Sequence, residues 1–61
     1  MDFVKHYYES KIQYGREFVE AIEEELAKEN ISREFREQLL MVKYNVLNEI
    51  GISRAKLDEL N

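Results

Sequence analysis

The sequence of 61 residues contains no cysteine, no proline and no tryptophan, and only two glycines. Without cysteine there is no disulfide framework and no thiolate metal site, and the redox compartment is undetermined. Without proline, and with so little glycine, almost nothing interrupts a helix. A chain of this size buries only about 60% of the surface that its unfolded form exposes, so its core is marginal without such cross-links.

Long apolar runs and an excess of basic residues are also missing. No stretch approaches the ~18 apolar residues of a membrane span, and no charged segment followed by an apolar run begins the chain, so we expect no membrane insertion and a cytoplasmic location. Thirteen acidic against nine basic residues give a net charge of −4. This negative charge argues against general electrostatic binding to nucleic acid, and it favours protein partners.

Residues that could form a catalytic or metal site are few. His6 is the single histidine, which without cysteine leaves no usual nucleophile and base arrangement, and there is no glycine-rich phosphate loop. The glutamates of the 20–29 segment are spread around a helix and are typical of a solvated face. We therefore expect no enzyme activity, no bound metal and no cofactor.

What the sequence does contain is an apolar stripe at helical spacing. Steps of four and three without a slip place the stripe on one face of a single helix. Asp2 is a suitable N-cap for this helix, which is expected to end near Lys28 or Glu29. The stripe consists of Val4, Tyr8, Ile12, Gly15, Val19, Ile22 and Leu26.

A second stripe follows Ser32, which has the side chain of an N-cap. Asn30 and Ile31 are expected to form the turn, and Gly51 the left-handed end of the second helix. Ser53 then caps a short last helix over 54–60. The sequence thus predicts one all-α domain over residues 1–61, an antiparallel helical hairpin with a short third helix. The second stripe consists of Phe35, Leu39, Val42, Val46 and Ile50.

Gly15 allows two interpretations of the first segment. A glycine inside a helix costs about 1 kcal/mol relative to alanine, so it could mark a break into two shorter helices. The unbroken phase of the stripe favours one continuous helix instead. In that case Gly15 is explained by the close approach of another helix.

Four aromatic residues lie beside the first stripe and make its apolar face too wide for one partner helix. They are Phe3, Tyr7, Tyr14 and Phe18. Either they complete the core of a homodimeric four-helix bundle, or part of this face binds a different protein. For partner binding we expect Tyr7, Tyr14, Phe18 and Ile22. For self-association we expect Val4, Tyr8, Ile12, Val19, Leu26, Leu39 and Val46.

The segment Tyr7 to Ile31, YYESKIQYGREFVEAIEEELAKENI, resembles the Sda family of small helical-hairpin proteins that inhibit a sensor histidine kinase. The residues that carry the resemblance are Arg16, Glu17, Phe18, Val19, Glu20, Ile22, Glu23, Glu25 and Leu26. The resemblance implies a turn at Gly15 and a kinase-contacting tip formed by Tyr14 and Phe18. The leucine-rich first helix of the family is here reduced to Phe3 and Val4, and about thirty further residues follow.

The C-terminal segment VLNEIGISRAKLDELN resembles the turn and second helix of a helix-turn-helix motif. Gly51 would lie in the turn, and Arg54 and Lys56 would contact DNA. Asp58 and Glu59 oppose them, and bulky Leu47 stands where such motifs usually have alanine. The sequence therefore favours a small non-enzymatic regulator that binds a protein, with a DNA-binding regulator or a purely structural dimerisation module as alternatives.

Overall fold

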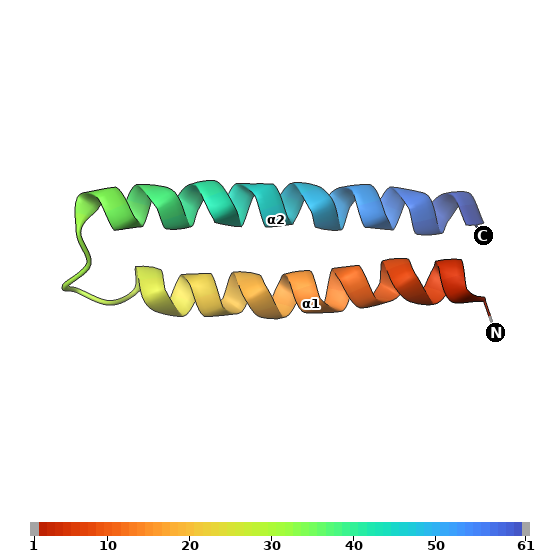
Figure 1. Ribbon diagram of the computed structural model, residues 1–61, viewed down its shortest axis with the longest axis horizontal. Coiled ribbons are helices and arrows are strands. Elements are labelled where there is room, and N and C mark those ends of the chain that lie inside the picture. The colour runs from red at the N-terminus through yellow and green to blue at the C-terminus, as the bar shows by residue number, and fades with distance from the viewer. Residues whose placement is uncertain (1, 61) are drawn as a thin grey trace.

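The computed structural model describes residues 2–60, which form two antiparallel α-helices joined by a short connection (Figure 1). Helix α1 spans Phe3–Leu26, and helix α2 spans Arg33–Leu60. The start of α1 and the end of α2 lie at one end of the hairpin, and the connection lies at the other. The predicted all-α helical hairpin is confirmed.

The start of each helix is fixed by a capping side chain. Oδ1 of Asp2 accepts hydrogen bonds from the backbone N–H groups of Val4 and Lys5, each at 3.1 Å. Oγ of Ser32 accepts a bond from the N–H of Phe35 at 3.1 Å. These bonds satisfy donors that the first turn of a helix leaves without partners, so both predicted N-caps are confirmed.

Helix α1 ends at Leu26, two to three residues earlier than predicted. The last turn tightens, because the N–H of Lys28 bonds to the carbonyl of Glu25 three residues back, at 3.2 Å. Across the connection, the guanidinium of Arg36 donates to the carbonyl of Leu26 at 3.4 Å. The first turn of α2 thus helps to satisfy the end of α1.

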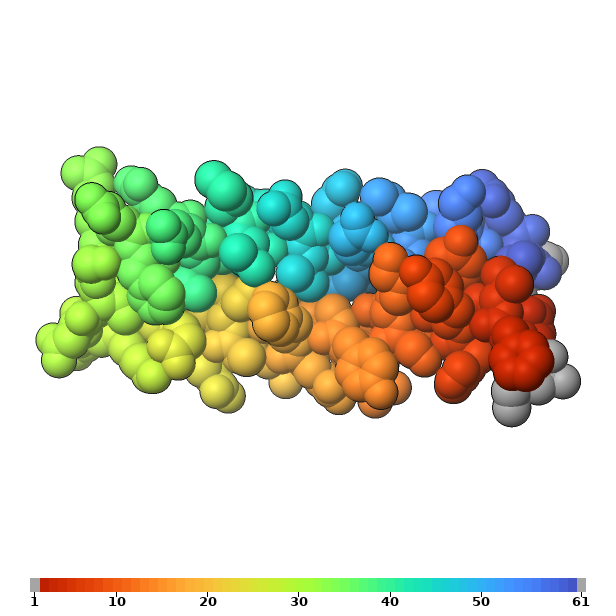
Figure 2. Space-filling view, in the orientation of Figure 1, coloured from red at the N-terminus to blue at the C-terminus, as the bar shows by residue number. Residues whose placement is uncertain are grey.

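The two helices pack side by side along their length (Figure 2), through a seam. Its contact residues recur in steps of four and three. Such spacing is that of an antiparallel coiled coil. Ile22 and Ile50 are the buried hydrophobic residues of the described chain, and Ser53 is the buried polar one. Helix α1 contributes Tyr8, Ile12, Gly15, Val19, Ile22 and Leu26, and α2 contributes Leu39, Lys43, Val46, Ile50, Ser53 and Leu57.

The seam of α2 differs from its predicted stripe. Lys43 and Ser53 occupy seam positions, whereas Phe35 and Val42 lie on the flank and are about 40% exposed. Lys43 is tolerated because its ammonium group reaches Glu23 of α1 at 3.2 Å while its stem lies along the seam. A search for apolar residues misses both positions, since neither residue is hydrophobic.

The predicted third helix is wrong, because α2 continues through Gly51 to Leu60. Gly51 does not adopt a positive φ, so no left-handed end forms there. Ile50, Ser53 and Leu57 keep the seam spacing across the glycine. Their packing against α1 outweighs the roughly 1 kcal/mol that a glycine costs inside a helix.

Helix α1 is continuous through Gly15, as the phase of its stripe predicts, and the turn that the family resemblance implies is not formed. A Cβ at Gly15 would lie 2.7 Å from Cγ1 and 3.0 Å from Cδ1 of Ile50. These distances are closer than ordinary van der Waals contact. Gly15 therefore permits a close approach of the two helices at Ile50, and the predicted explanation of this residue is confirmed.

The two glycines predict opposite effects of alanine. A Cβ at Gly51 meets nothing within 4 Å, so Gly51→Ala gains about 1 kcal/mol of helix propensity and raises the melting temperature by several degrees. Gly15→Ala has the same gain but overpacks the seam, at a cost of about 1–3 kcal/mol, and lowers the melting temperature. Circular dichroism melts of both variants measure this. Equal stabilisation by both would show that the contact with Ile50 is absent in solution.

Candidate protein-binding surface

Four aromatic side chains of α1 form an exposed row beside the seam, which we call the aromatic row: Phe3, Tyr7, Tyr14 and Phe18. Their spacing of four, seven and four residues keeps them on one flank of the helix. Between 52% and 76% of each side chain is exposed. The row is therefore not used by the packing of α1 against α2.

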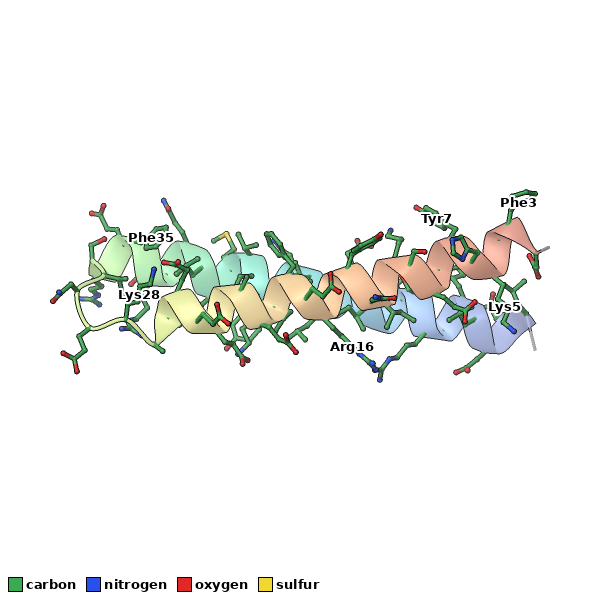
Figure 3. The ribbon with its side chains drawn as sticks, turned by 90° about the horizontal axis from the view of Figure 1, so that it is seen from below. Phe3, Lys5, Tyr7, Arg16, Lys28 and Phe35 are labelled. Atoms are coloured by element: carbon green, nitrogen blue, oxygen red, sulfur yellow. The ribbon has the colours of Figure 1, made fainter. Side chains whose placement is uncertain are left out.

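The aromatic row lies on one broad side of the hairpin, which we call the aromatic face. Figure 3 shows Phe3 and Tyr7 of α1 and Phe35 of α2 projecting to the same side, with Arg16 projecting to the opposite side. Val42 follows Phe35 by seven residues and therefore shares its flank of α2. Apolar side chains of both helices thus contribute to this face.

The contacts of Lys11 connect the aromatic row to α2. Its Nζ lies 5.4 Å from the centroid of the Tyr7 ring and 3.4 Å from Oε2 of Glu49. The Tyr7 ring also meets the Tyr8 ring edge to face, with 5.1 Å between centroids. The hydrogen bond to Glu49, followed by the interaction with Tyr7, raises the pKa of the Lys11 ammonium group above its ordinary value of 10.5. Lys11 remains charged and holds Tyr7 at the edge of the face.

A shallow hollow of about 200 Å³ opens between the two helices next to the aromatic row. Gly15 and Ile50 line it, and the side chain of Ile50 already occupies the space that a Cβ of Gly15 would need. Lys11 and Glu49 are at its rim, and Val42, Asn45 and Val46 contribute to its wall. Gly15 follows Tyr14 directly in α1, so the Tyr14 ring and the hollow lie at the same level along the hairpin, although Tyr14 does not line the hollow.

The opposite flank of α1 carries charged side chains. The ion pair of Glu23 with Lys43 lies there, and Figure 3 shows Arg16 pointing to this side. Glu9 and Glu20 fall on the same flank at steps of seven and four from Arg16. The hairpin thus has one aromatic face and one charged face.

The structure divides the predicted site residues into two sets. Tyr7, Tyr14 and Phe18 lie together on the aromatic face, whereas Ile22 is buried in the seam and only 4% exposed. Ile22 must therefore be removed from the partner-binding residues.

The predicted self-association residues pack mainly within one chain. Half-buried seam residues of the hairpin itself are Tyr8, Ile12, Val19, Leu26, Leu39 and Val46. Of the predicted set, only Val4, near the start of α1, is largely exposed. The stripe that predicts pairing between copies therefore serves the pairing of α1 with α2. Phe35 and Val42 of the second stripe are also surface residues, although the sequence pattern placed them in the core.

The remaining chemistry of the described chain is sparse. Residues 2–60 contain no group of three His, Asp or Glu side chains placed to hold a metal ion. Within the same range no helix is long and apolar enough to span a bilayer. The turn at Gly51 that a helix-turn-helix motif requires is replaced by continuous helix.

Comparison with protein-family models, with curated proteins and with solved structures finds no match to this chain.

Two aspartate substitutions distinguish the seam from the aromatic face. Ile22→Asp places a carboxylate in the seam, where an unpaired charge costs several kcal/mol, so we expect loss of most of the helical signal. Phe18→Asp changes a side chain that is 52% exposed and costs far less stability. Urea unfolding of both variants, followed by circular dichroism, measures the difference. If Phe18→Asp were as destabilising as Ile22→Asp, Phe18 would belong to the core.

Proposed function

We propose that this chain is a small non-enzymatic regulatory protein that binds another protein chain through its aromatic face. The observation that carries this proposal is the aromatic row, four large rings left exposed on one flank of a hairpin whose seam is already complete. Tyrosine and phenylalanine give large contact area for little loss of side-chain freedom, and aromatic residues are enriched at protein interfaces. The proposed anchors are Tyr7, Tyr14 and Phe18.

Self-association is part of the proposal. Only two hydrophobic side chains, Ile22 and Ile50, are buried in the described hairpin. A core this small supplies little stability to a chain without disulfides or metal, and such chains commonly obtain the rest by oligomerisation. A helical bundle formed by several hairpins would cover the apolar side chains that one hairpin leaves in water.

The resemblance to the Sda family makes a sensor histidine kinase the first heterologous partner to test. It assigns the contact to Tyr14 and Phe18, which lie one helical turn apart on the aromatic face. Because α1 is continuous through Gly15, the two rings would be presented by the side of a helix and not by the tip of a hairpin. The proposed regulatory effect is inhibition of the kinase.

A kinase assay tests this partner. The protein should lower the autophosphorylation rate of a sensor histidine kinase from its own organism, and Tyr14→Ala with Phe18→Ala should remove most of the inhibition. A matched control is Met41→Ala with Tyr44→Ala, which truncates two side chains of α2 that are about equally exposed and lie off the aromatic face. Helical signal is recorded for each sample. Equal inhibition by both double variants would contradict a role for the aromatic face.

Light scattering tests self-association. We expect a mass that is a multiple of the 7.4 kDa chain and a melting temperature that rises with protein concentration, because only the folded state associates. A mass of one chain over a hundredfold concentration range, with a constant melting temperature, would contradict self-association. The aromatic face would then be left for a different protein.

A further inference from the structure

We propose that a second copy of this chain covers the aromatic face, with Tyr14 and Phe18 of each copy seated on α2 of the other beside the hollow at Gly15. The proposal rests on the self-association proposed above and specifies its geometry. It makes the hollow a binding site for an aromatic side chain.

The large side chains and the hollow of the aromatic face have complementary shapes. On the aromatic face the large exposed rings of Tyr14 and Phe18 belong to α1. The hollow lies between Gly15 and the α2 residues Val42 and Val46. Ring and hollow are at the same level along the hairpin, since Tyr14 directly precedes Gly15. Stacking α1 on α1 of a second copy would place rings against rings and leave both hollows empty.

A twofold symmetric dimer allows both copies to make this contact at once. In a twofold interface each contact occurs twice with the roles of the copies exchanged. A twofold axis parallel to the helices rotates the second copy by 180°. α1 of each copy then lies on α2 of the other, and every residue keeps its height along the axis. The rings of each copy then meet the hollow of the other, and all neighbouring helices run antiparallel, as in an up-and-down four-helix bundle.

Charge supports the same arrangement. Lys11 and Glu49 form a pair across the rim of the hollow at 3.4 Å. In the proposed pairing, Lys11 of each copy approaches Glu49 of the other, so opposite charges meet at the centre of the interface. Stacking α2 on α2 about the same level would bring the two Glu49 carboxylates together, which is unfavourable.

The size of the face is sufficient. The hairpin extends 46 Å by 16 Å along its two longest axes, a projected area of about 700 Å². A standard protein interface buries roughly 800 Å² of accessible surface on each partner, which a face of this extent can supply. A second copy would cover this face from end to end. A foreign protein that uses the same anchors would have to displace that copy.

Cysteine cross-linking tests the arrangement, because the natural chain has no cysteine. Glu25 shares the flank of Phe18, and Gln38 lies between Phe35 and Val42 on the flank of α2. The bond from Arg36 to the carbonyl of Leu26 and the pair of Lys43 with Glu23 place these two positions at one level. Glu25→Cys and Gln38→Cys, made as separate chains, mixed, unfolded and refolded together, should therefore form a mixed disulfide dimer on oxidation.

Two controls accompany the mixture. Neither variant alone should cross-link efficiently, since identical positions lie on helices that are diagonal in the bundle. Glu20→Cys, on the charged flank, should not cross-link with Gln38→Cys. A dimer by light scattering that gives no mixed disulfide, or in which Glu25→Cys links to itself as readily, would overturn the arrangement while leaving self-association intact. A monomer would overturn both.

Filling the hollow provides a second, independent readout. Val42→Phe adds bulk to the hollow and should raise the dimer dissociation constant at least tenfold, as measured by sedimentation equilibrium. Leu47→Phe adds the same ring type at another exposed position of α2, outside the hollow and one helical turn from Lys43 on the charged side, and should leave the constant within about twofold of the natural chain. If Val42→Phe associated as well as Leu47→Phe, the hollow would not be occupied in the dimer.

Discussion

The contact of Gly15 with Ile50 is the constraint on which the rest of the hairpin depends. Without a Cβ at Gly15, α2 approaches α1 so closely that an alanine there would press on Ile50. This approach fixes the level of the two helices, and the steps of four and three on either side then bring the other seam residues together. Gly15 and Ile50 also line the hollow on the aromatic face.

The division of apolar residues between seam and surface follows from that packing. Two helices can bury only a narrow strip of each other, so α1, with an apolar face much wider than one strip, cannot hide all of it. Ile22 is buried within the seam, while Phe18, four residues earlier, is left half exposed. The aromatic face is thus a consequence of a hairpin with only two helices, and it gives the chain a surface suited to another chain.

The two faces also differ in their charged side chains. The charged flank of α1 carries the pair of Glu23 with Lys43 and projects Arg16 into water. On the aromatic face, Lys11 and Glu49 neutralise each other at the centre. An interface there would bury paired charges and aromatic rings, whereas one on the charged flank would have to desolvate several carboxylates. This difference favours the aromatic face for protein binding.

The sequence by itself determined the all-α hairpin, its N-caps at Asp2 and Ser32 and the position of Tyr14 and Phe18 beside the main stripe, and it favoured a first helix that is continuous through Gly15. These features depend on local propensity and on the phase of one helix. Only the tertiary structure decided that Lys43 and Ser53 lie in the seam, that Val42 and Phe35 lie outside it and that α2 continues through Gly51. The reason is physical: which strip of a broad amphipathic helix is buried depends on the position and level of the partner helix, and packing across a glycine can outweigh its local cost.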